Sequence, residues 1–374
     1  ILWKTFEMDL NKLGWNPQLE TAFDEYRDKY ETGRVSVVHR NLCRVFTTHG
    51  EIDAVVSRKL INDLTDTTGK TRYQLSKVSK FPAVGDWVLI TYSKKDGKAI
   101  LNGVLPRVTK ISRSDVGRST DEQIVAANID RVFLVMALNF DFNLRRVERY
   151  LTVLANSGIA PVVILNKCDL VENLDEKKVE IDSITSDVPV HLTSALKNEG
   201  LDALRPYLTE GSTSIFIGSS GAGKTTMINK IIGEDLYRVQ DISEHKDRGK
   251  HTTSAREMIV LDNGSIIIDT PGLRRIDLWN DQDGLDDVFS DIVDLSNQCK
   301  FRNCTHTSEP HCAIIIAIDQ GKLSENRLAN YKKLQGELAH VNRKSKYRQD
   351  RRARIGYKKG IRKEDKVDYH QRDK

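Results

Sequence analysis

The sequence lacks long hydrophobic runs and a recognisable targeting signal. Its longest apolar stretches, such as Val132–Leu138 and Cys312–Ile318, are far shorter than the roughly 20 residues that a membrane-spanning helix needs. The first residues, Ile1–Lys4, do not show the basic segment followed by an apolar segment that marks a secretory signal. We therefore expect no membrane association and a cytoplasmic location.

Cysteine is also scarce. There are five cysteines in 374 residues, and three of them lie within fourteen positions. In a cytosolic chain, an odd and clustered set of this kind is more typical of metal binding than of disulfides. The chain is long enough for two or three domains of roughly 100–200 residues each, so no disulfide is required to stabilise a core.

The basic excess is small and unevenly distributed. The formal net charge is +5. Residues 341–374 contain 14 basic and 5 acidic residues, so the preceding 340 residues carry a net charge of −4. Tyr347 and Tyr357 lie within this basic tail, a composition that suits contacts with RNA phosphates. A solvated helix is the alternative interpretation.

Residues 34–113 predict a small β-barrel. Short alternating segments are separated by polar turns, and Asp96-Gly97 is a strong hairpin signal. Five such strands suit a barrel of the oligonucleotide-binding (OB) or a similar type; a structural β-domain without a ligand is the alternative. Residues 1–33 form an N-terminal extension with a short helix around Leu19–Tyr30 and no functional interpretation. The expected strands are Arg34–Val38, Cys43–Thr48, Ile52–Val56, Trp87–Tyr92 and Ala99–Pro106.

Residues 114–290 predict an α/β domain. Apolar runs alternate with helical patterns, such as the leucine and valine spacing from Leu144 to Leu154, which is typical of a doubly wound parallel sheet. Ligands bind such sheets at the carboxyl ends of the strands, so the residues after each run are candidates for a site. The expected strands are Arg131–Leu138, Pro161–Leu165, Val188–Leu192, Ser214–Ile217, Glu257–Leu261 and Ser265–Ile268.

A complete phosphate-binding loop follows the strand Ser214–Ile217. Its glycines allow backbone N–H groups to surround phosphates, while Lys224 reaches the outer phosphates and the Thr225 hydroxyl ligates Mg²⁺. The helix that begins at about Thr226 adds its positive N-terminal end. The loop residues are Gly218, Ser219, Ser220, Gly221, Ala222, Gly223, Lys224 and Thr225.

A second phosphate-side motif, Asp269-Thr270-Pro271-Gly272, follows the strand Ser265–Ile268. An acidic residue at this place in nucleoside triphosphatases holds Mg²⁺, and the Gly272 N–H would contact the γ-phosphate. Alone, Asp and Gly after a strand often form only a turn. Because Asp269 follows Lys224 by 45 residues, the nucleotide-binding interpretation is favoured over a simple turn.

The tetrapeptide Asn166-Lys167-Cys168-Asp169 predicts recognition of guanine. The Asp169 carboxylate can accept hydrogen bonds from the ring N–H and the amino group of guanine, which adenine does not offer. Asn166 would bond the base edge and brace the phosphate loop, and the stem of Lys167 would cover the ring.

The tripeptide Thr193-Ser194-Ala195 follows the next expected strand. The backbone N–H of Ala195, positioned with Ser194, would bind the guanine carbonyl. For this tripeptide alone, a helix cap is the alternative. Its place after the Asn166–Asp169 motif favours the guanine-binding role.

Both guanine motifs precede the phosphate loop, which reverses the common order in GTPases. No second Asn-Lys-x-Asp follows Gly272. A circular permutation explains this order, because the termini of compact domains often lie close together; two half-built domains are the alternative. The permutation connects the nucleotide-sensing segment Asp269–Gly272 directly to the C-terminal region.

The C-terminal region, residues 291–374, contains the cysteine cluster and a long polar and basic helical stretch. Three thiolates and one imidazole form the closed ligand set of a structural zinc site. His311 is a competing ligand, and buried free cysteines are the alternative. The expected ligands are Cys299, Cys304, His306 and Cys312.

Together these motifs resemble the circularly permuted GTPases that assist assembly of the small ribosomal subunit (the RsgA, YjeQ or YloQ type). The resemblance extends over about residues 34–340 and includes Val84–Val88 in the barrel and Asn139–Asn143 before a helix. It implies an OB-type barrel, a permuted GTPase domain and a zinc-binding helical C-terminal domain. It also implies hydrolysis of GTP to GDP, stimulated by the small ribosomal subunit, which with its rRNA would be the partner. We expect a monomer.

The segment Gly249–Thr253 lies between the phosphate loop and Asp269. A Thr in this region of many GTPases ligates Mg²⁺ only when the γ-phosphate is present; Thr252 and Thr253 are both candidates, and we favour Thr253. The position of the water-orienting Gln of Ras-like enzymes is Leu273 here. The resemblance implies that His251 is the catalytic group instead; a His without a catalytic role is the alternative.

The sequence therefore predicts an assembly-factor GTPase that binds GTP or GDP, Mg²⁺ and one structural Zn²⁺. Two rival functions stay open: a zinc-containing RNA-binding module with negligible hydrolysis, and a GTPase that acts on a protein partner. The intact Lys224, Thr225 and Asp269 argue against the first rival. The barrel and the basic tail argue against the second.

Overall fold

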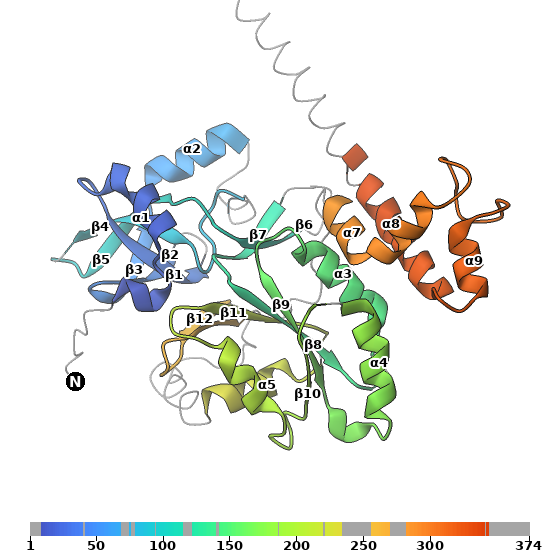
Figure 1. Cartoon of the computed structure of the whole chain (residues 1–374). Helices are drawn as coiled ribbons and strands as arrows, with labels where there is room; N and C mark the ends of the chain where they lie inside the picture. Colours follow the sequence, from blue (N-terminus) through green and yellow to red (C-terminus); the bar gives the residue numbers. More distant parts are fainter. Residues whose placement is uncertain are drawn as a thin grey trace, which may run out of the picture. The chain divides into compact units, whose positions relative to one another are not determined.

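In the computed structural model the chain divides into two units, residues 1–277 and residues 278–374, which are described separately (Figure 1). No helix in the described part of the chain combines the length and apolar character that a bilayer-spanning segment requires. The described residues are 9–39, 42–68, 75, 79–93, 95–114, 122–139, 142–185, 187–219, 221–233, 256–269, 282–340 and 342–343.

The first unit begins with a closed barrel of five strands. The hydrogen-bonded order β1-β2-β3-β5-β4 returns to β1, with β3 and β5 parallel and the other pairs antiparallel. This closure, with helix α2 (Arg58–Thr68) after β3, confirms the OB-type barrel. The strands are β1 (Glu31–His39), β2 (Leu42–Thr47), β3 (Gly50–Val56), β4 (Trp87–Ser93) and β5 (Lys98–Val104).

Side-chain alternation explains why these segments close into a barrel. On β3, Ile52, Ala54 and Val56 are buried while the residues between them are exposed. The buried rows of the strands form one apolar core, as the period of two residues in a strand requires. Gly97, in the turn between β4 and β5, has a φ of 59°, the conformation that the Asp96-Gly97 signal predicted.

Arg34 joins three parts of the first unit. Its side chain lies in the interior of β1 and is almost fully buried. The guanidinium donates hydrogen bonds to the carbonyls of Leu13, Gly85 (3.2 Å) and Asn128 (2.7 Å), and it lies 5.6 Å from the ring centre of Trp87. The N-terminal segment, the barrel and the entrance to the α/β domain are therefore held by one cation.

Two further elements of the first unit differ from what the sequence pattern predicts. The expected helix around residues 19–30 is shorter, because α1 (Pro17–Phe23) passes into the 3₁₀ turn η2 (Asp24–Tyr26). A two-stranded ribbon, β6 (Lys110–Ser114) with β7 (Glu122–Ala127), connects the barrel to the α/β domain. Its short strands lack a long apolar run, so the sequence pattern does not distinguish them from loop.

The α/β domain contributes six strands, in the order β10-β9-β8-β11-β13-β12, to a sheet that continues from β12 into β1 of the barrel. The first five are parallel, as expected, but β12 is antiparallel to β13. The reason is the short turn between them, because only antiparallel neighbours can be joined without a crossover. The strands are β8 (Arg131–Ala137), β9 (Ala160–Asn166), β10 (Val190–Thr193), β11 (Thr213–Ile217), β12 (Glu257–Val260) and β13 (Ile266–Asp269).

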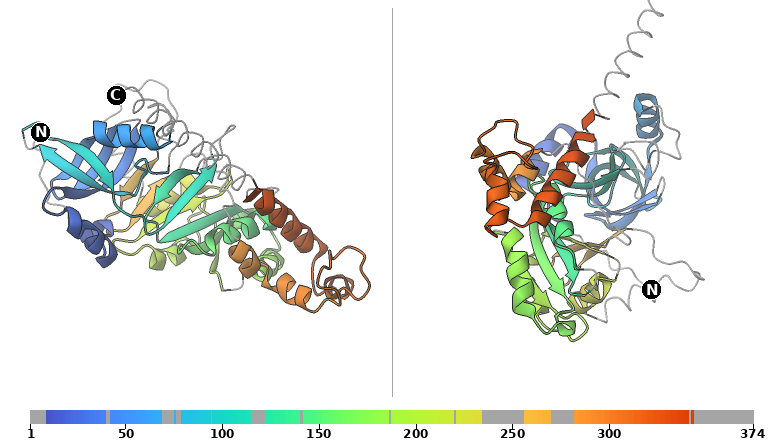
Figure 2. Two further views of the ribbon diagram at one scale, coloured as in Figure 1. Left: turned by 90° about the horizontal axis from the view of Figure 1, so that it is seen from above. Right: turned by 90° about the vertical axis from the view of Figure 1, so that its right-hand side faces the viewer.

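The path of the chain through this sheet confirms the permutation. The chain enters at β8, moves through β9 to the edge strand β10, and returns past β8 to β11. Helix α5 (Lys224–Ile232) and the 3₁₀ helix η5 (Leu201–Tyr207) cover one face of the sheet. Helices α3 (Leu144–Leu154) and α4 (Leu174–Thr185) cover the other (Figure 2). The strand order reverses between β8 and β11, and the carboxyl ends of the strands at such a point are where sheets of this kind bind ligands.

The second unit is helical. Its described helices are α7 (Gln282–Val288), α8 (Ser290–Asn297), α9 (Ala313–Asp319) and residues 325–340. Arg327 holds this unit together, because its guanidinium pairs with both carboxylate oxygens of Asp291 (2.7 and 2.8 Å). The same group lies 4.7 Å from the ring centre of Phe289, a cation–π contact.

Candidate functional site

The loop after β11 has a backbone that only glycine can form at two positions. A Cβ on Gly218 would lie 2.1 Å from the carbonyl oxygen of Val135 on β8. Gly223, which caps α5, has a φ of 94°, and a Cβ there would lie 2.2 Å from Nδ2 of Asn166. Both glycines therefore allow a close approach of backbone that a side chain would block. The predicted phosphate loop has the geometry its sequence requires, and its Ser220 lies outside the described residues.

Lys224 and the first turn of α5 supply the positive charge of this site. The Lys224 ammonium lies over the loop and donates to the carbonyls of Gly218 (2.8 Å) and Ser219 (2.6 Å). Thr225 and Thr226 are exposed in the first turn of α5, which contains no acidic residue. A helix N-terminus without a competing carboxylate, next to a lysine, suits the phosphates of a nucleotide.

Asn166 links three loops at the carboxyl ends of the strands. Its side chain is buried and donates from Nδ2 to the carbonyl of Ala222 in the phosphate loop (2.7 Å). Its Oδ1 accepts from the hydroxyl of Thr193 (3.1 Å) and from the backbone N–H of Ala195 (3.0 Å). Asn166 therefore contacts the phosphate loop directly, as the bracing role suggested by the sequence requires.

The base-recognition residues lie beside this brace. Lys167 adopts a left-handed backbone conformation, with a φ of 65°, at the turn that leads to Asp169. The hydroxyl of Ser194 donates to the Asp169 carboxylate and holds its pKa below the usual value. The N–H of Ala195 is directed at Asn166, so a bond to the guanine carbonyl would share this hydrogen.

Asp269 ends β13, next to the strand that leads into the phosphate loop. The register pairs Ile215 of β11 with Ile268 of β13, so Asp269 and the loop leave the sheet at the same edge. Oxygen ligands from Thr225 and Asp269 suit Mg²⁺, which prefers carboxylate and hydroxyl oxygens. The other predicted residues of this side, His251, Thr252, Thr253, Gly272 and Leu273, lie outside the described residues.

The second unit brings together the four predicted metal ligands. The donor atoms of Cys299, Cys304, His306 and Cys312 all lie within 4.8 Å of one another. The Sγ atoms of Cys299 and Cys312 are 3.8 Å apart, and they lie 3.6 and 3.5 Å from Nδ1 of His306. A tetrahedral site with Zn–S of about 2.3 Å and Zn–N of about 2.1 Å has edges of about 3.8 and 3.6 Å. Cys299, His306 and Cys312 therefore have the separations of a tetrahedral zinc site, Cys304 lies within reach of the same centre, and His311 is not part of the group.

Neighbouring residues hold the loop that carries His306. This residue has a φ of 56°, and its carbonyl accepts a hydrogen bond from Lys332 (2.9 Å). The Glu309 carboxylate accepts from the backbone N–H groups of Thr305 (2.7 Å) and Thr307 (2.9 Å). Burial lowers the pKa of His306, which favours the neutral imidazole that binds a metal. The role of Glu309 has no counterpart among the sequence predictions, because an acidic residue in a polar loop has no periodic signal.

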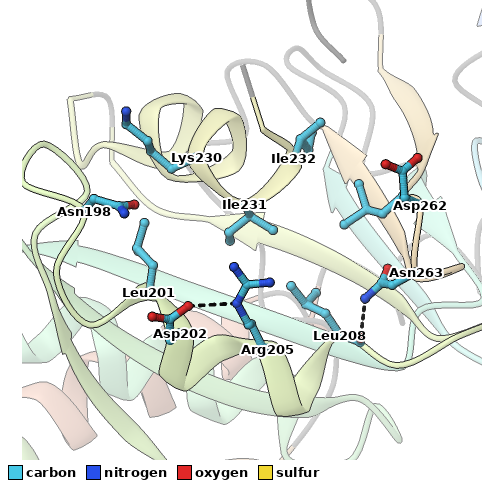
Figure 3. Close-up of a pocket in the computed structure, with 11 residues that line it drawn as sticks. Asn198, Leu201, Asp202, Arg205, Leu208, Lys230, Ile231, Ile232, Asp262 and Asn263 are labelled. Carbon is cyan, nitrogen blue, oxygen red and sulfur yellow. Dashed lines mark hydrogen bonds and ion pairs between the residues drawn. The ribbon is translucent and has the colours of Figure 1, made fainter. Parts of the chain in front are cut away.

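A separate cavity of about 420 Å³ lies away from the phosphate loop, between η5, the last turn of α5 and the β12–β13 turn (Figure 3). Its rim carries the ion pair of Arg205 and Asp202 (2.8 Å) and the contact of Asn263 with the carbonyl of Leu208 (2.9 Å). Because Lys224 starts α5 and this cavity adjoins its end, the cavity does not belong to the nucleotide site.

Comparison with known proteins agrees with this architecture. The model of the RsgA GTPase family matches residues 104–279, and a model described as 50S ribosome-binding GTPase matches residues 213–350. The small ribosomal subunit biogenesis GTPase RsgA of Methanosarcina acetivorans is 40% identical over 332 residues, which cover 89% of this chain and 86% of that protein.

Two solved structures share the fold. YjeQ from Thermotoga maritima aligns with a TM-score of 0.57 and 25% identity, over 83% of this chain and 98% of that one. YloQ, a circularly permuted GTPase, aligns with a TM-score of 0.53 and 21% identity, over 85% and 97%, which supports the fold alone. From the sequence identity over most of both chains, the protein belongs to the RsgA family of GTPases.

Proposed function

We propose that this protein hydrolyses GTP and thereby assists late assembly of the small ribosomal subunit, which stimulates its turnover. The family supports this function, because the curated relatives are named small ribosomal subunit biogenesis GTPases. The main structural support for the GTPase assignment is the position of Asn166. One buried amide connects the phosphate loop to both loops that would surround a guanine base, so phosphate and base binding are organised together.

The proposed catalytic roles follow from the placement of each group. Lys224 would neutralise the outer phosphates, and Thr225, Thr253 and Asp269 would hold Mg²⁺, which supplies charge stabilisation at the γ-phosphate when bound. Gly272 would contact the γ-phosphate through its N–H. Since Leu273 has no group that can bond water, His251 is proposed to orient the attacking water. Asp169, with Asn166, Lys167, Ser194 and Ala195, would select guanine.

The second unit is proposed to hold one structural zinc ion. Cys299, Cys304, His306 and Cys312 form a closed set without an open coordination position, and a closed set folds a domain rather than catalysing a reaction. The spacing of the donor atoms supports zinc over disulfides, because three thiols and an imidazole share one centre.

The proposed division of the chain is an extension (1–33), a barrel (34–113), a GTPase domain (114–290) and a zinc-binding domain with a basic tail (291–374). The tail, net +9 over residues 341–374, is proposed to contact rRNA, since phosphate contacts need clustered cations. A cytoplasmic location follows from action on ribosomal subunits, and the monomeric state stays a prediction.

GTP turnover with and without purified small subunits tests this function. We expect slow intrinsic hydrolysis, clear stimulation by the subunits, and loss of turnover in Lys224→Ala. His251→Ala should bind GTP normally but lose stimulated turnover; full turnover in this variant would contradict its catalytic role. A chain ending at residue 340 should bind subunits more weakly and with a smaller salt dependence. The absence of any stimulation in the wild type would refute the proposed function.

A further inference from the structure

Two arginines from different elements converge on one short stretch of β7. Arg113 on β6 donates from Nε to the side-chain oxygen of Gln123, its cross-strand partner (3.0 Å). Arg256, the residue before β12, extends its Nη1 toward the carbonyls of Ile124 (3.5 Å) and Val125 (3.4 Å). Both guanidinium groups therefore reach residues 123–125, within the ribbon that connects the barrel to the GTPase sheet (Figure 1).

Neither of these half-buried arginines has an ion pair among the described residues. The nearby Glu122 pairs with Lys110 at 2.7 Å. Burial, and then the positive charge of Arg113, lower the pKa of Arg256 to about 10. Two like charges thus interact in a partly desolvated place.

Two other buried arginines of the first unit have carboxylates near them. Arg107 pairs with the buried carboxylate of Asp86 at 2.6 Å. Arg34 experiences the opposite charges of Asp130 and Asp86 and donates to three carbonyls. Arg256 has instead two long contacts and a like charge as its neighbour. Since an uncompensated buried charge is costly, this pair is a place where an anion would bind.

The chemistry of the guanidinium group identifies the anion. Its planar set of N–H donors fits two oxygens of a phosphate, and the distances of 3.4–3.5 Å at Arg256 are too long to satisfy those donors fully. The nucleotide phosphates have their own loop at Lys224. OB-type barrels bind oligonucleotides, and the ribbon that carries Arg113 continues from such a barrel.

We propose that Arg113 and Arg256 form a binding site for a phosphate group of an RNA backbone. This inference rests on the proposed action on the small ribosomal subunit, and the site would fix RNA at the ribbon between barrel and GTPase domain. Arg256 also directly precedes β12, whose first residue, Glu257, is paired with Asp269. A phosphate bound there would lie beside the strand pair that carries the magnesium ligand.

The phosphate site is tested first without RNA, by thermal unfolding of the full chain in phosphate and in chloride at matched ionic strength. Phosphate at about ten times its dissociation constant should raise the melting temperature of the wild type by about 3 °C. Arg113→Gln and Arg256→Gln should each lose most of this shift. The double variant should lose no more than either single variant, because both side chains hold one anion. Arg205→Gln, which removes an exposed cation elsewhere, is the matched control.

The RNA arm measures affinity for purified small subunits over a range of salt concentrations. Arg256→Gln should lower the slope of log affinity against log salt by about one, the effect of one lost phosphate contact, while Arg205→Gln should leave it unchanged. Melting temperatures in chloride and basal GTP turnover report whether each variant is folded. Basal turnover should match the wild type, and the melting temperature in chloride should be no lower than that of the wild type, because Arg113→Gln and Arg256→Gln each remove a costly buried charge.

Each outcome decides a part of the proposal. An equal phosphate shift in the wild type and in all variants would overturn the anion site. If the variants lose the phosphate-induced rise in melting temperature but keep the wild-type salt dependence of subunit binding, RNA is not the source of the phosphate. Free phosphate is then the ligand. Failure of wild-type protein to bind subunits at all would instead refute the proposed function, so the two failures are distinguishable.

Discussion

Replacement of Asn166 should show how much of the nucleotide affinity depends on the hydrogen bonds that brace the loops of the site, as distinct from direct contacts with the nucleotide. Asn166→Ala removes three hydrogen bonds, to Ala222, Thr193 and Ala195. At about 1 kcal/mol for each bond, the loops lose up to about 3 kcal/mol of preorganisation. If the nucleotide must restore that order on binding, its affinity falls by about 100-fold.

The control for this prediction is Thr193→Val, which removes one of the same three bonds. Its expected cost is about 1 kcal/mol, or about fivefold in affinity. Asn166→Asp should be at least as damaging as the alanine variant, because it places a carboxylate oxygen where Nδ2 now donates to the Ala222 carbonyl at 2.7 Å. Two oxygens at that distance without a hydrogen repel each other.

The assay is equilibrium titration with a fluorescent GDP analogue, accompanied by urea unfolding of the nucleotide-free protein. A folded Asn166→Ala variant that binds GDP no more weakly than Thr193→Val would refute the bracing argument. A large loss of unfolding free energy with unchanged affinity would also contradict it, because the amide would then support the fold alone.

Three further predictions test other parts of the molecule. Guanine affinity should persist on acidification until the pH falls through the depressed pKa of Asp169. Ser194→Ala should raise that pKa. GDP titrations at several pH values should therefore show the loss of affinity at a higher pH in this variant than in the wild type. Removal of zinc by a strong chelator, or Cys312→Ser, should abolish the helical signal of the second unit and leave GDP affinity intact, since a structural zinc contributes about 10 kcal/mol or more to folding. Arg34→Met should lower the unfolding free energy of the first unit by about 3 kcal/mol in urea titrations, because three buried carbonyls lose their donor; a loss below about 1 kcal/mol would mean that water replaces the guanidinium.

The strands and the sites were predictable where one short stretch of sequence contains the whole signal. The alternation on β3 is visible in residues 52–56 alone. The phosphate loop is equally local, because its glycines at positions 218 and 223 allow the close contacts with the Val135 backbone and the Asn166 side chain. The metal ligands are clustered within fourteen residues, and the structure brings the same four donors together.

The unpredicted features depend on partners that are distant in sequence. Arg34 resembles any other arginine in an alternating strand, and only the fold shows that its acceptors are on residues 13, 85 and 128. Arg113 and Arg256 are 143 positions apart, so no local pattern relates them. The antiparallel β12 was missed for a different reason: an apolar strand shows its burial in its sequence but not its direction.

The permutation gives the segment after β13 a role that an uninterrupted GTPase domain would not give it. Among the described residues, all other strands of this sheet precede β13 in the chain. In the sequence, residues 270–281 connect β13 to α7 of the second unit. The segment in which Gly272 is proposed to contact the γ-phosphate therefore also joins the GTPase sheet to the unit that holds the four predicted zinc ligands.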